Sequence, residues 1–114
     1  MASEKKALWV VFRPEKAESV ASMREKFLAS YQNFKEMQSL FSKVWWCNPE
    51  EGVWGAMYIF NSDEELQEYL NSDLWLKKVP EKWGYKPEII QILDLGPILY
   101  KQSVTKGENS WLTG

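Results

Sequence analysis

Lysine and tyrosine are the side chains of this sequence that could do chemistry in an apolar setting. Lys43 lies between apolar neighbours in residues 40–47, Leu-Phe-Ser-Lys-Val-Trp-Trp-Cys. A lysine that is removed from water has a lowered pKa, which lets its amine act as a base or its cation hold an enolate. A lysine in such a strand also commonly extends its charged end to the rim or pairs with an interfacial carboxylate. Both interpretations of Lys43 stay open.

Aromatic residues form a second group of candidates. Tyr69 has the spacing of a helix residue that faces a core, where its phenol can bind a ligand or simply pack and hydrogen-bond its tip. Tyr58 shares one face of a predicted strand with Trp54 and Phe60, and this cluster could enclose a flat aromatic guest or be a filled core. Trp75 and Trp83 flank an irregular stretch that could act as a lid. The candidate binding residues are Phe27, Tyr31, Trp54, Phe60, Leu70 and Trp75.

The sequence contains no histidine and one cysteine, Cys47. Ser-His-Asp and Cys-His nucleophilic pairs, HExxH zinc sites and a histidine-ligated haem are therefore excluded within this chain. A single cysteine forms neither an intrachain disulfide nor a thiolate metal cage, which is typical of a reducing compartment. We expect no metal site.

Length and charge bound the remaining possibilities. A chain of 114 residues, 45% hydrophobic and 26% charged, is typical of one soluble globular domain. The net charge of −2, the pI near 5.2 and the lack of long basic runs disfavour nucleic acid and membrane partners. No segment is long enough to span a bilayer, so we expect a cytoplasmic protein. Gly96-Pro97 predicts a boundary between a domain at 1–96 and a C-terminal tail at 97–114.

The pattern of apolar residues predicts four strands and two helices. Strands are expected at 6–12, 40–47, 53–60 and 88–95, with a hairpin connecting the second and third. A helix at about 15–34 follows Pro14, with the stripe Val20, Met23, Phe27, Tyr31 and Phe34. Ser62 and Glu65 form a capping box for a second helix, which Pro80 should end. The order β-α-β-β-α-β is the ferredoxin-like α+β plan, an antiparallel four-stranded sheet with helices on one face.

Two helices cover only one face of such a sheet, yet these strands are apolar on both faces. In the first strand Trp9 and Val11 oppose the other apolar residues, and in the fourth Ile90 and Ile92 oppose Ile89, Leu93 and Leu95. Trp45 and Trp46 must also point to opposite faces, so at most one of them can line a given cavity. The uncovered face predicts a homodimer in which two sheets pack together.

The sequence resembles the dimeric α+β barrel superfamily, and most closely the YdhR-type monooxygenases related to the antibiotic biosynthesis monooxygenases. The resemblance is strongest over about residues 40–70. It rests on Lys43-Val44-Trp45, a short loop ending in Gly52, Gly-Ala-Met-Tyr-Ile-Phe at 55–60 and Ser-Asp-Glu-Glu-Leu-Gln-Glu-Tyr-Leu at 62–70. The family pattern has Gly-Gly where this chain has Gly55-Ala56.

This resemblance implies a ligand cavity between sheet and helices in each subunit of a dimeric barrel. Relatives often carry tryptophan and histidine where this chain reads Phe60 and Tyr69, so an imidazole-dependent mechanism is not expected. The implied function is cofactor-independent oxidation of a small hydrophobic aromatic or polyketide-like compound, with Tyr69 or Tyr58 as proton donor and Lys43 stabilising charge. The alternatives are a polyketide cyclase or isomerase, or a non-catalytic homodimer that binds a small ligand.

Overall fold

The computed structural model describes residues 5–16 and 18–99. The elements, in order, are β1 (Lys6–Phe12), α1 (Val20–Phe34), β2 (Leu40–Asn48), β3 (Val53–Phe60), α2 (Asp63–Leu70), η1 (Leu74–Lys78), α3 (Val79–Trp83) and β4 (Glu88–Asp94). The order confirms the predicted β-α-β-β-α-β plan and adds the short helices η1 and α3 before the last strand. Most of the predicted C-terminal tail, from residue 100 onward, lies outside the described residues.

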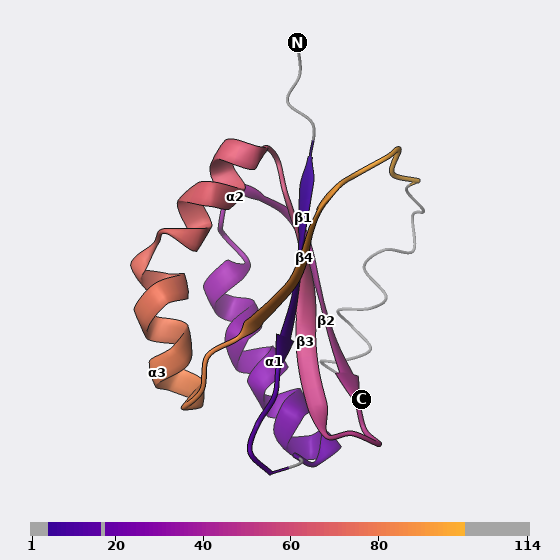
Figure 1. Cartoon of the computed structure of the whole chain (residues 1–114), viewed down its shortest axis with the longest axis vertical. Helices are drawn as coiled ribbons and strands as arrows, with labels where there is room; N and C mark the ends of the chain where they lie inside the picture. The colour runs from indigo at the N-terminus through magenta and orange to yellow at the C-terminus, as the bar shows by residue number, and fades with distance from the viewer. Residues whose placement is uncertain (1–4, 17, 100–114) are drawn as a thin grey trace.

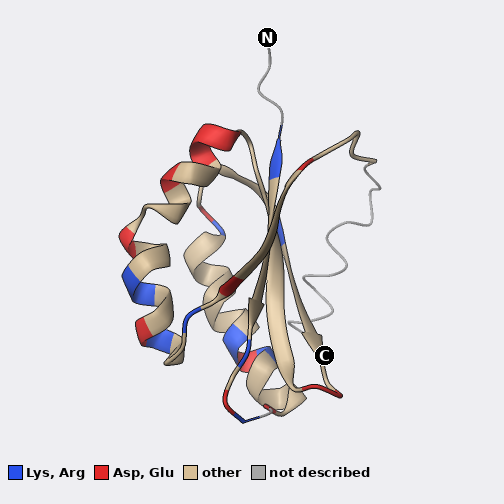
Figure 2. Cartoon of the chain, viewed as in Figure 1, with Lys and Arg blue, Asp and Glu red and all other residues tan. Residues whose placement is uncertain are grey.

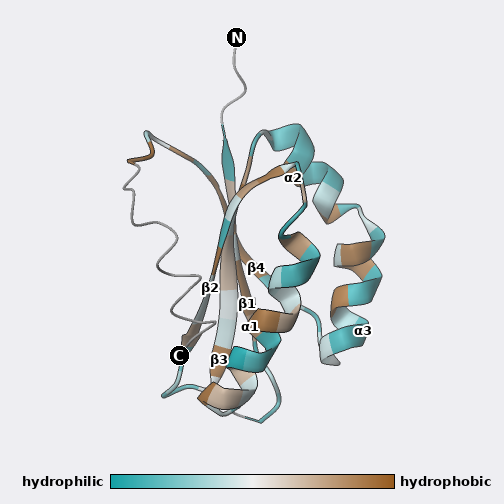
Figure 3. Cartoon of the chain, turned by 180° about the vertical axis from the view of Figure 1, so that it is seen from behind, coloured by the Kyte–Doolittle hydropathy of each residue, from teal (hydrophilic) through white to brown (hydrophobic). Residues whose placement is uncertain are grey.

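The four strands form one antiparallel sheet with the order β2-β3-β1-β4. β1 and β3 occupy its centre, and β2 and β4 form its edges. Figure 1 shows α1, α2 and α3 on the same side of this sheet, and Figure 3 shows the same two layers from behind. The predicted ferredoxin-like α+β fold is therefore confirmed.

The core lies between the helices and the centre of the sheet. Each helix-facing residue of β1 pairs with a helix-facing residue of β3, because side chains alternate between the two faces of a strand. These pairs are Leu8 with Tyr58, Val10 with Ala56 and Phe12 with Trp54. All six residues are at most 3% exposed. The rings of Phe12 and Trp54 stack with centroids 4.0 Å apart, so this part of the core is filled by protein.

The first helix begins later than its sequence predicts. α1 starts at Val20, whereas Pro14 and the following acidic residues predict a start near residue 15. Ser19 is the N-cap, and its side chain accepts a hydrogen bond from the Ser22 backbone N–H at 3.1 Å. Glu18 meanwhile accepts a hydrogen bond at 2.8 Å from the Ser22 hydroxyl and pairs with Lys26. Glu18 therefore lies before the helix and binds Ser22 and Lys26, and it is not part of the first turn of α1.

The prediction that Pro80 ends the helical region is wrong. Pro80 is the second residue of α3, where the missing N–H of proline costs no intrahelical hydrogen bond. The segment before it, η1, is a π-helix, a rare conformation that is frequent at functional sites. α3 ends at Gly84, whose φ of 83° is readily adopted by glycine.

The face assignment within the fourth strand is also corrected. The pairing of β1 with β4 shifts register between Trp9 and Val10, which is a β-bulge. Ile92 lies opposite Leu8, but it is Ile89 and not Ile90 that lies opposite Val10. Simple alternation therefore fails here because the bulge adds one residue to β4.

The sheet face away from the helices carries apolar residues, as predicted. Val44 is 59% exposed on this face. The ring of Trp46 covers Gly55 so closely that a Cβ there would lie 2.5 Å from the ring and 2.2 Å from the Val10 carbonyl oxygen. Glycine is required at this position by that close approach. Trp45 lies on the opposite face, toward α1, where its ring centroid is 6.0 Å from that of Tyr31.

Within the ranges that the structure describes, no helix is both long and apolar enough to cross a membrane.

Candidate functional site

Lys43 is the charged residue at the centre of the candidate site. It lies inside β2, whereas Lys6, Glu88 and Asp94 stand at the ends of β1 and β4, and β3 contains no charged residue. Figure 2 shows the charged residues of the molecule gathered mainly on the helices and near the strand ends. A lysine in the middle of a half-buried strand carries a desolvation cost, which makes it a candidate for chemistry.

Three aromatic rings surround the amine of Lys43. Its Nζ lies 3.3 Å from the ring centroid of Phe34, 4.2 Å from that of Tyr58 and 4.5 Å from that of Trp45. No carboxylate of the described residues pairs with it. Burial lowers the pKa of Lys43 well below its usual value. Ring faces favour the cation by about 0.5–2 kcal/mol each, whereas removing an ammonium from water costs several kcal/mol, so burial shifts the balance toward the neutral amine.

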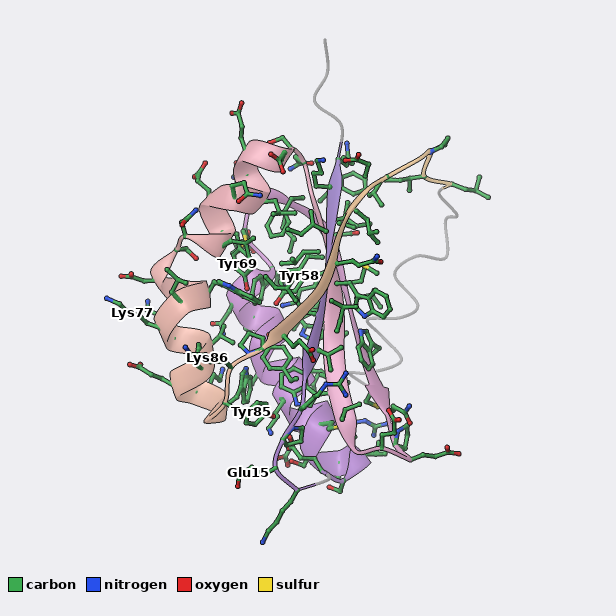
Figure 4. All side chains as sticks on the ribbon, in the orientation of Figure 1. Glu15, Tyr58, Tyr69, Lys77, Tyr85 and Lys86 are labelled. Atoms are coloured by element: carbon green, nitrogen blue, oxygen red, sulfur yellow. The ribbon has the colours of Figure 1, made fainter. Side chains whose placement is uncertain are left out.

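Tyr58 and Tyr69 meet beside this amine. The Tyr69 hydroxyl donates a hydrogen bond to the Tyr58 hydroxyl at 3.3 Å, and Figure 4 shows the two side chains close together between α2 and the sheet. Burial raises the pKa of Tyr58 to about 12, although the hydrogen bond from Tyr69 acts in the opposite direction. Burial, followed by the interaction with Tyr58, also raises the pKa of Tyr69. Both phenols stay protonated at neutral pH and are hydrogen-bond donors.

Phe34 is the residue that the sequence did not single out. Its ring contacts Lys43 and stands edge-on to the rings of Tyr58 and Tyr69, with centroids 5.8 Å and 6.0 Å away. In the sequence it was only the last member of an amphipathic stripe. Phe34 comes three residues after Tyr31, at the end of α1 and facing β2. That spacing is the signal that could have identified it as a residue of the site. The structure thus brings all three predicted catalytic residues around one unpredicted phenylalanine.

Two hollows flank Phe34. The helix cleft, between α1 and the η1–α3 segment, has a volume of about 590 Å³ and is lined by Ser30, Asn33, Phe34, Leu74, Lys78, Val79, Glu81, Lys82 and Trp83. The β2 groove has a volume of about 180 Å³ and is lined by Tyr31, Phe34, Lys35, Met37, Leu40, Phe41, Ser42, Lys43 and Trp45. Phe34 lines both hollows, whereas Lys43 lines only the β2 groove.

The predicted binding residues are divided between these surroundings. Tyr31 lines the β2 groove beside Lys43. Trp54 and Phe60 are at most 1% exposed and lie in the filled core, together with Phe27 and Trp75. Leu70 is half-buried and packs against that core. Of the two tryptophans that could form a lid, Trp83 lines the helix cleft, whereas Trp75 packs on Tyr69 with ring centroids 5.5 Å apart.

A second polar cluster lies at the other end of the core. The Trp54 indole N–H donates to the Tyr85 hydroxyl at 2.9 Å, and that hydroxyl donates to Glu18 at 3.1 Å. Lys26 forms an ion pair with Glu18. Burial acts to raise the pKa of Glu18, but the hydrogen bonds from Lys26, Ser22 and Tyr85 outweigh it and hold the pKa below its usual value. The cluster is satisfied internally and, as Figure 4 shows for Tyr85, lies away from Tyr58 and Tyr69.

Metal ligands do not gather in the described part of the chain. No group of three or more histidine, cysteine, aspartate or glutamate side chains lies close enough there to hold a metal ion.

Comparison with known proteins identifies the family. The model of the family described as "Putative mono-oxygenase ydhR" matches residues 8–86, which include the candidate site. The chain belongs to the YdhR family. No curated protein sequence matches it.

Solved structures share the fold of this YdhR-family chain at low sequence identity. NE2512 of Nitrosomonas europaea, a protein of unknown function, is 17% identical with a TM-score of 0.62, over 89% of this chain and 98% of that one. A variant of SnoaB, a cofactor-independent oxygenase from Streptomyces nogalater, is 9% identical with a TM-score of 0.62, over 87% and 100%. MupZ from Pseudomonas fluorescens is 9% identical with a TM-score of 0.57, over 91% and 94%. At these identities the likeness concerns the fold, while the family match supports a monooxygenase-like function.

Proposed function

We propose that this chain is a cofactor-independent monooxygenase that oxidises a small hydrophobic phenolic or polyketide-like compound. The observation that carries the proposal is the enclosure of the Lys43 amine by three aromatic rings, with two protonated phenols next to it. Membership of the YdhR family and the shared fold with the oxygenase SnoaB support the reaction class.

Oxidation without a cofactor requires the substrate to become an anion that can give electrons to dioxygen. In an anthrone, the reacting position is a CH₂ between two aromatic rings. The neutral amine of Lys43 removes one proton and leaves an enolate. The resulting ammonium remains beside the negative charge, and the Tyr58 hydroxyl donates a hydrogen bond to the enolate oxygen. These contacts stabilise charge as it develops.

The remaining steps balance without another reagent. The enolate transfers an electron to dioxygen, the two radicals combine into a peroxide through a new C–O bond, and the peroxide takes the proton back from Lys43. Loss of water from the hydroperoxide breaks the O–O bond and leaves a ketone. One CH₂ and one O₂ thus become one C=O and one H₂O.

The helix cleft is the proposed entry for the substrate. Its volume of about 590 Å³ lies within the usual range of small-molecule sites. The substrate would approach over Phe34, and displacement of that ring would bring it to Lys43, Tyr58 and Tyr69. Tyr31 and Trp45, which contact each other beside Lys43, complete the apolar surroundings of the bound ring.

A non-catalytic homodimer that binds a small ligand is the second candidate. Tyr58 and Tyr69 are only 2% and 4% exposed, and neither lines the helix cleft or the β2 groove. This packing favours a protein that holds a ligand in the helix cleft without bringing it to the phenols. Cyclase or isomerase chemistry by the same residues would differ from oxidation in its product mass.

Oxygen consumption with anthrone separates these candidates. The wild-type protein, freed of flavin and metal by dialysis against a chelator, should consume dioxygen in the presence of anthrone. Lys43→Met should lose this activity, whereas Lys35→Met, which removes an exposed lysine from the rim of the same groove, should retain it. Binding of a panel of phenols without oxygen consumption would favour the ligand-binding homodimer instead.

We also propose that two copies pack through the sheet face that lies opposite the helices. Val44 is more than half exposed there, and Trp9, Trp46, Met57 and Ile59 are half-buried neighbours of the same face. Apolar patches of this kind are rarely left uncovered on soluble monomers.

A further inference from the structure

We propose that Lys43 is a carbonyl-reactive amine and that the β2 groove admits small aromatic aldehydes, which form an imine with its Nζ. This activity does not depend on dioxygen and does not rest on the oxidation proposed above. It rests on the position of the amine, on the groove beside it and on the aromatic character of the surrounding side chains.

The surroundings of the amine favour a nucleophile. The Nζ is enclosed by Phe34, Tyr58 and Trp45 and has no carboxylate partner among the described residues. The titratable groups beside it include the phenol of Tyr58 on β3, and Tyr31 on α1 and Lys35 at its C-cap, which line the same groove. None of these is a carboxylate, so none of them pairs with the amine as an acidic side chain would.

The groove gives an aldehyde access to this amine. Lys43 is half-buried and lines the hollow itself, together with the apolar side chains of Leu40, Phe41 and Met37. Its volume of about 180 Å³ slightly exceeds the roughly 150 Å³ of an apolar cavity that binds benzene. A single aromatic ring therefore fits beside the amine.

The reaction follows ordinary amine chemistry. The lone pair of Nζ attacks the aldehyde carbon to form a C–N bond and a carbinolamine. Loss of water then breaks the C–O bond and leaves the C=N imine. Cyanoborohydride, added as the trapping reductant, delivers a hydride to the imine carbon and gives a stable secondary amine.

The test is competitive labelling of the wild-type protein with benzaldehyde and sodium cyanoborohydride near neutral pH, followed by peptide mass mapping. Burial lowers the pKa of Lys43 and so raises its neutral fraction, and the groove holds the aldehyde next to the amine, so Lys43 should be labelled several-fold faster than Lys35. Lys35 is the matched comparison because it lies on the same groove but is exposed. Labelling of Lys43 no faster than Lys35 would overturn the proposal.

Unfolding provides an independent measurement. In urea the groove is lost, so benzaldehyde should label Lys43 no faster than an exposed lysine such as Lys77. Lys43→Met should remove the fast benzaldehyde site, and Lys77→Met, which removes an exposed lysine outside the groove, should leave it. A fast benzaldehyde site that persists in Lys43→Met, or labelling of Lys43 only after unfolding in urea, would show that the groove does not present a reactive amine.

Discussion

The amine nitrogen of Lys43 lies 3.3 Å from the centroid of the Phe34 ring, and Phe34 lines both the helix cleft and the β2 groove. Phe34 belongs to the last turn of α1, and Lys43 to the middle of the edge strand β2. The ring covers one side of the amine, and Lys43 lines only the β2 groove and not the larger helix cleft. The identity of residue 34 should therefore control both the chemistry of Lys43 and the access of ligands to it.

Shortening Phe34 should open the helix cleft toward Lys43. Phe34→Leu is expected to lower the KM for anthrone several-fold, because the substrate no longer has to displace a ring. Phe27→Leu is the matched control, since Phe27 is equally buried on α1 but lines neither hollow. Both changes should cost about 1–3 kcal/mol of unfolding free energy. Steady-state oxygen consumption provides the comparison, and an equal change of KM in both variants would contradict the assigned role.

Removing the amine of Lys43 should stabilise the protein in a pH-dependent way. The pKa of Lys43 is lower in the folded state than in the unfolded state, so between the two values the unfolded chain binds more protons. Stability of the wild type should then rise with pH, with a slope of up to about 1.4 kcal/mol per pH unit from this one group.

The measurement is urea unfolding of the wild type and Lys43→Met at several pH values from neutral to alkaline. The variant should be more stable near neutral pH, and its advantage should shrink as the pH approaches the ordinary lysine value. Lys77→Met removes an exposed lysine and should show no such trend. A difference between wild type and Lys43→Met that does not vary with pH would mean that the amine keeps its charge in the folded state.

The two phenols should differ in their effect on turnover. Tyr69 donates to Tyr58, which leaves the Tyr58 proton for a bound oxyanion. Tyr58→Phe is expected to lower kcat about 100-fold, as does the removal of other oxyanion donors, whereas Tyr69→Phe acts only through Tyr58 and should lower kcat less. Each variant should lose about 1 kcal/mol of stability with the hydrogen bond. Tyr85→Phe is the control outside the site and should leave kcat unchanged. If Tyr85→Phe lowered kcat as much as Tyr58→Phe does, the assignment of Tyr58 as the oxyanion donor would be wrong.

A charge on the uncovered sheet face should separate the proposed dimer. Val44→Glu introduces a carboxylate where the side chain is 59% exposed, so the fold should tolerate it while sheet packing between two copies should not. Leu76→Glu is the matched control, since Leu76 is 54% exposed on η1, on the helix side. Sedimentation should show a dimer for wild type and Leu76→Glu and a monomer for Val44→Glu. A monomeric wild type at micromolar concentration would refute the dimer.

The sequence predicts the strands of this fold well because they are continuous apolar runs bounded by turn residues. The predicted limits 6–12 and 53–60 agree with β1 and β3. The errors occur where a tertiary contact overrides a local signal. Glu18 lies before α1 and pairs with Lys26, so the helix begins later than predicted. Pro80 lies in a short helix that follows a π-helical turn, and the spacing of apolar residues does not reveal such a turn.

The candidate site could be predicted only in its parts. Lys43 stands out as a charge inside a strand, and Tyr58 and Tyr69 as aromatic residues at core spacing. Their meeting point depends on Phe34, which comes from α1 and contacts all three residues. Neither the bulge in β4 nor the division of space into a helix cleft and a β2 groove follows from spacing, because both depend on how separate elements pack.

The product mass under isotopically labelled dioxygen tests the central claim most directly. Anthrone incubated with the cofactor-free protein under ¹⁸O₂ should yield a ketone that contains one ¹⁸O atom, and Lys43→Met should yield none above the rate without protein. A product of unchanged mass, a product that has only lost water, or label formation that is equal with and without the Lys43 amine would contradict oxidation at this site.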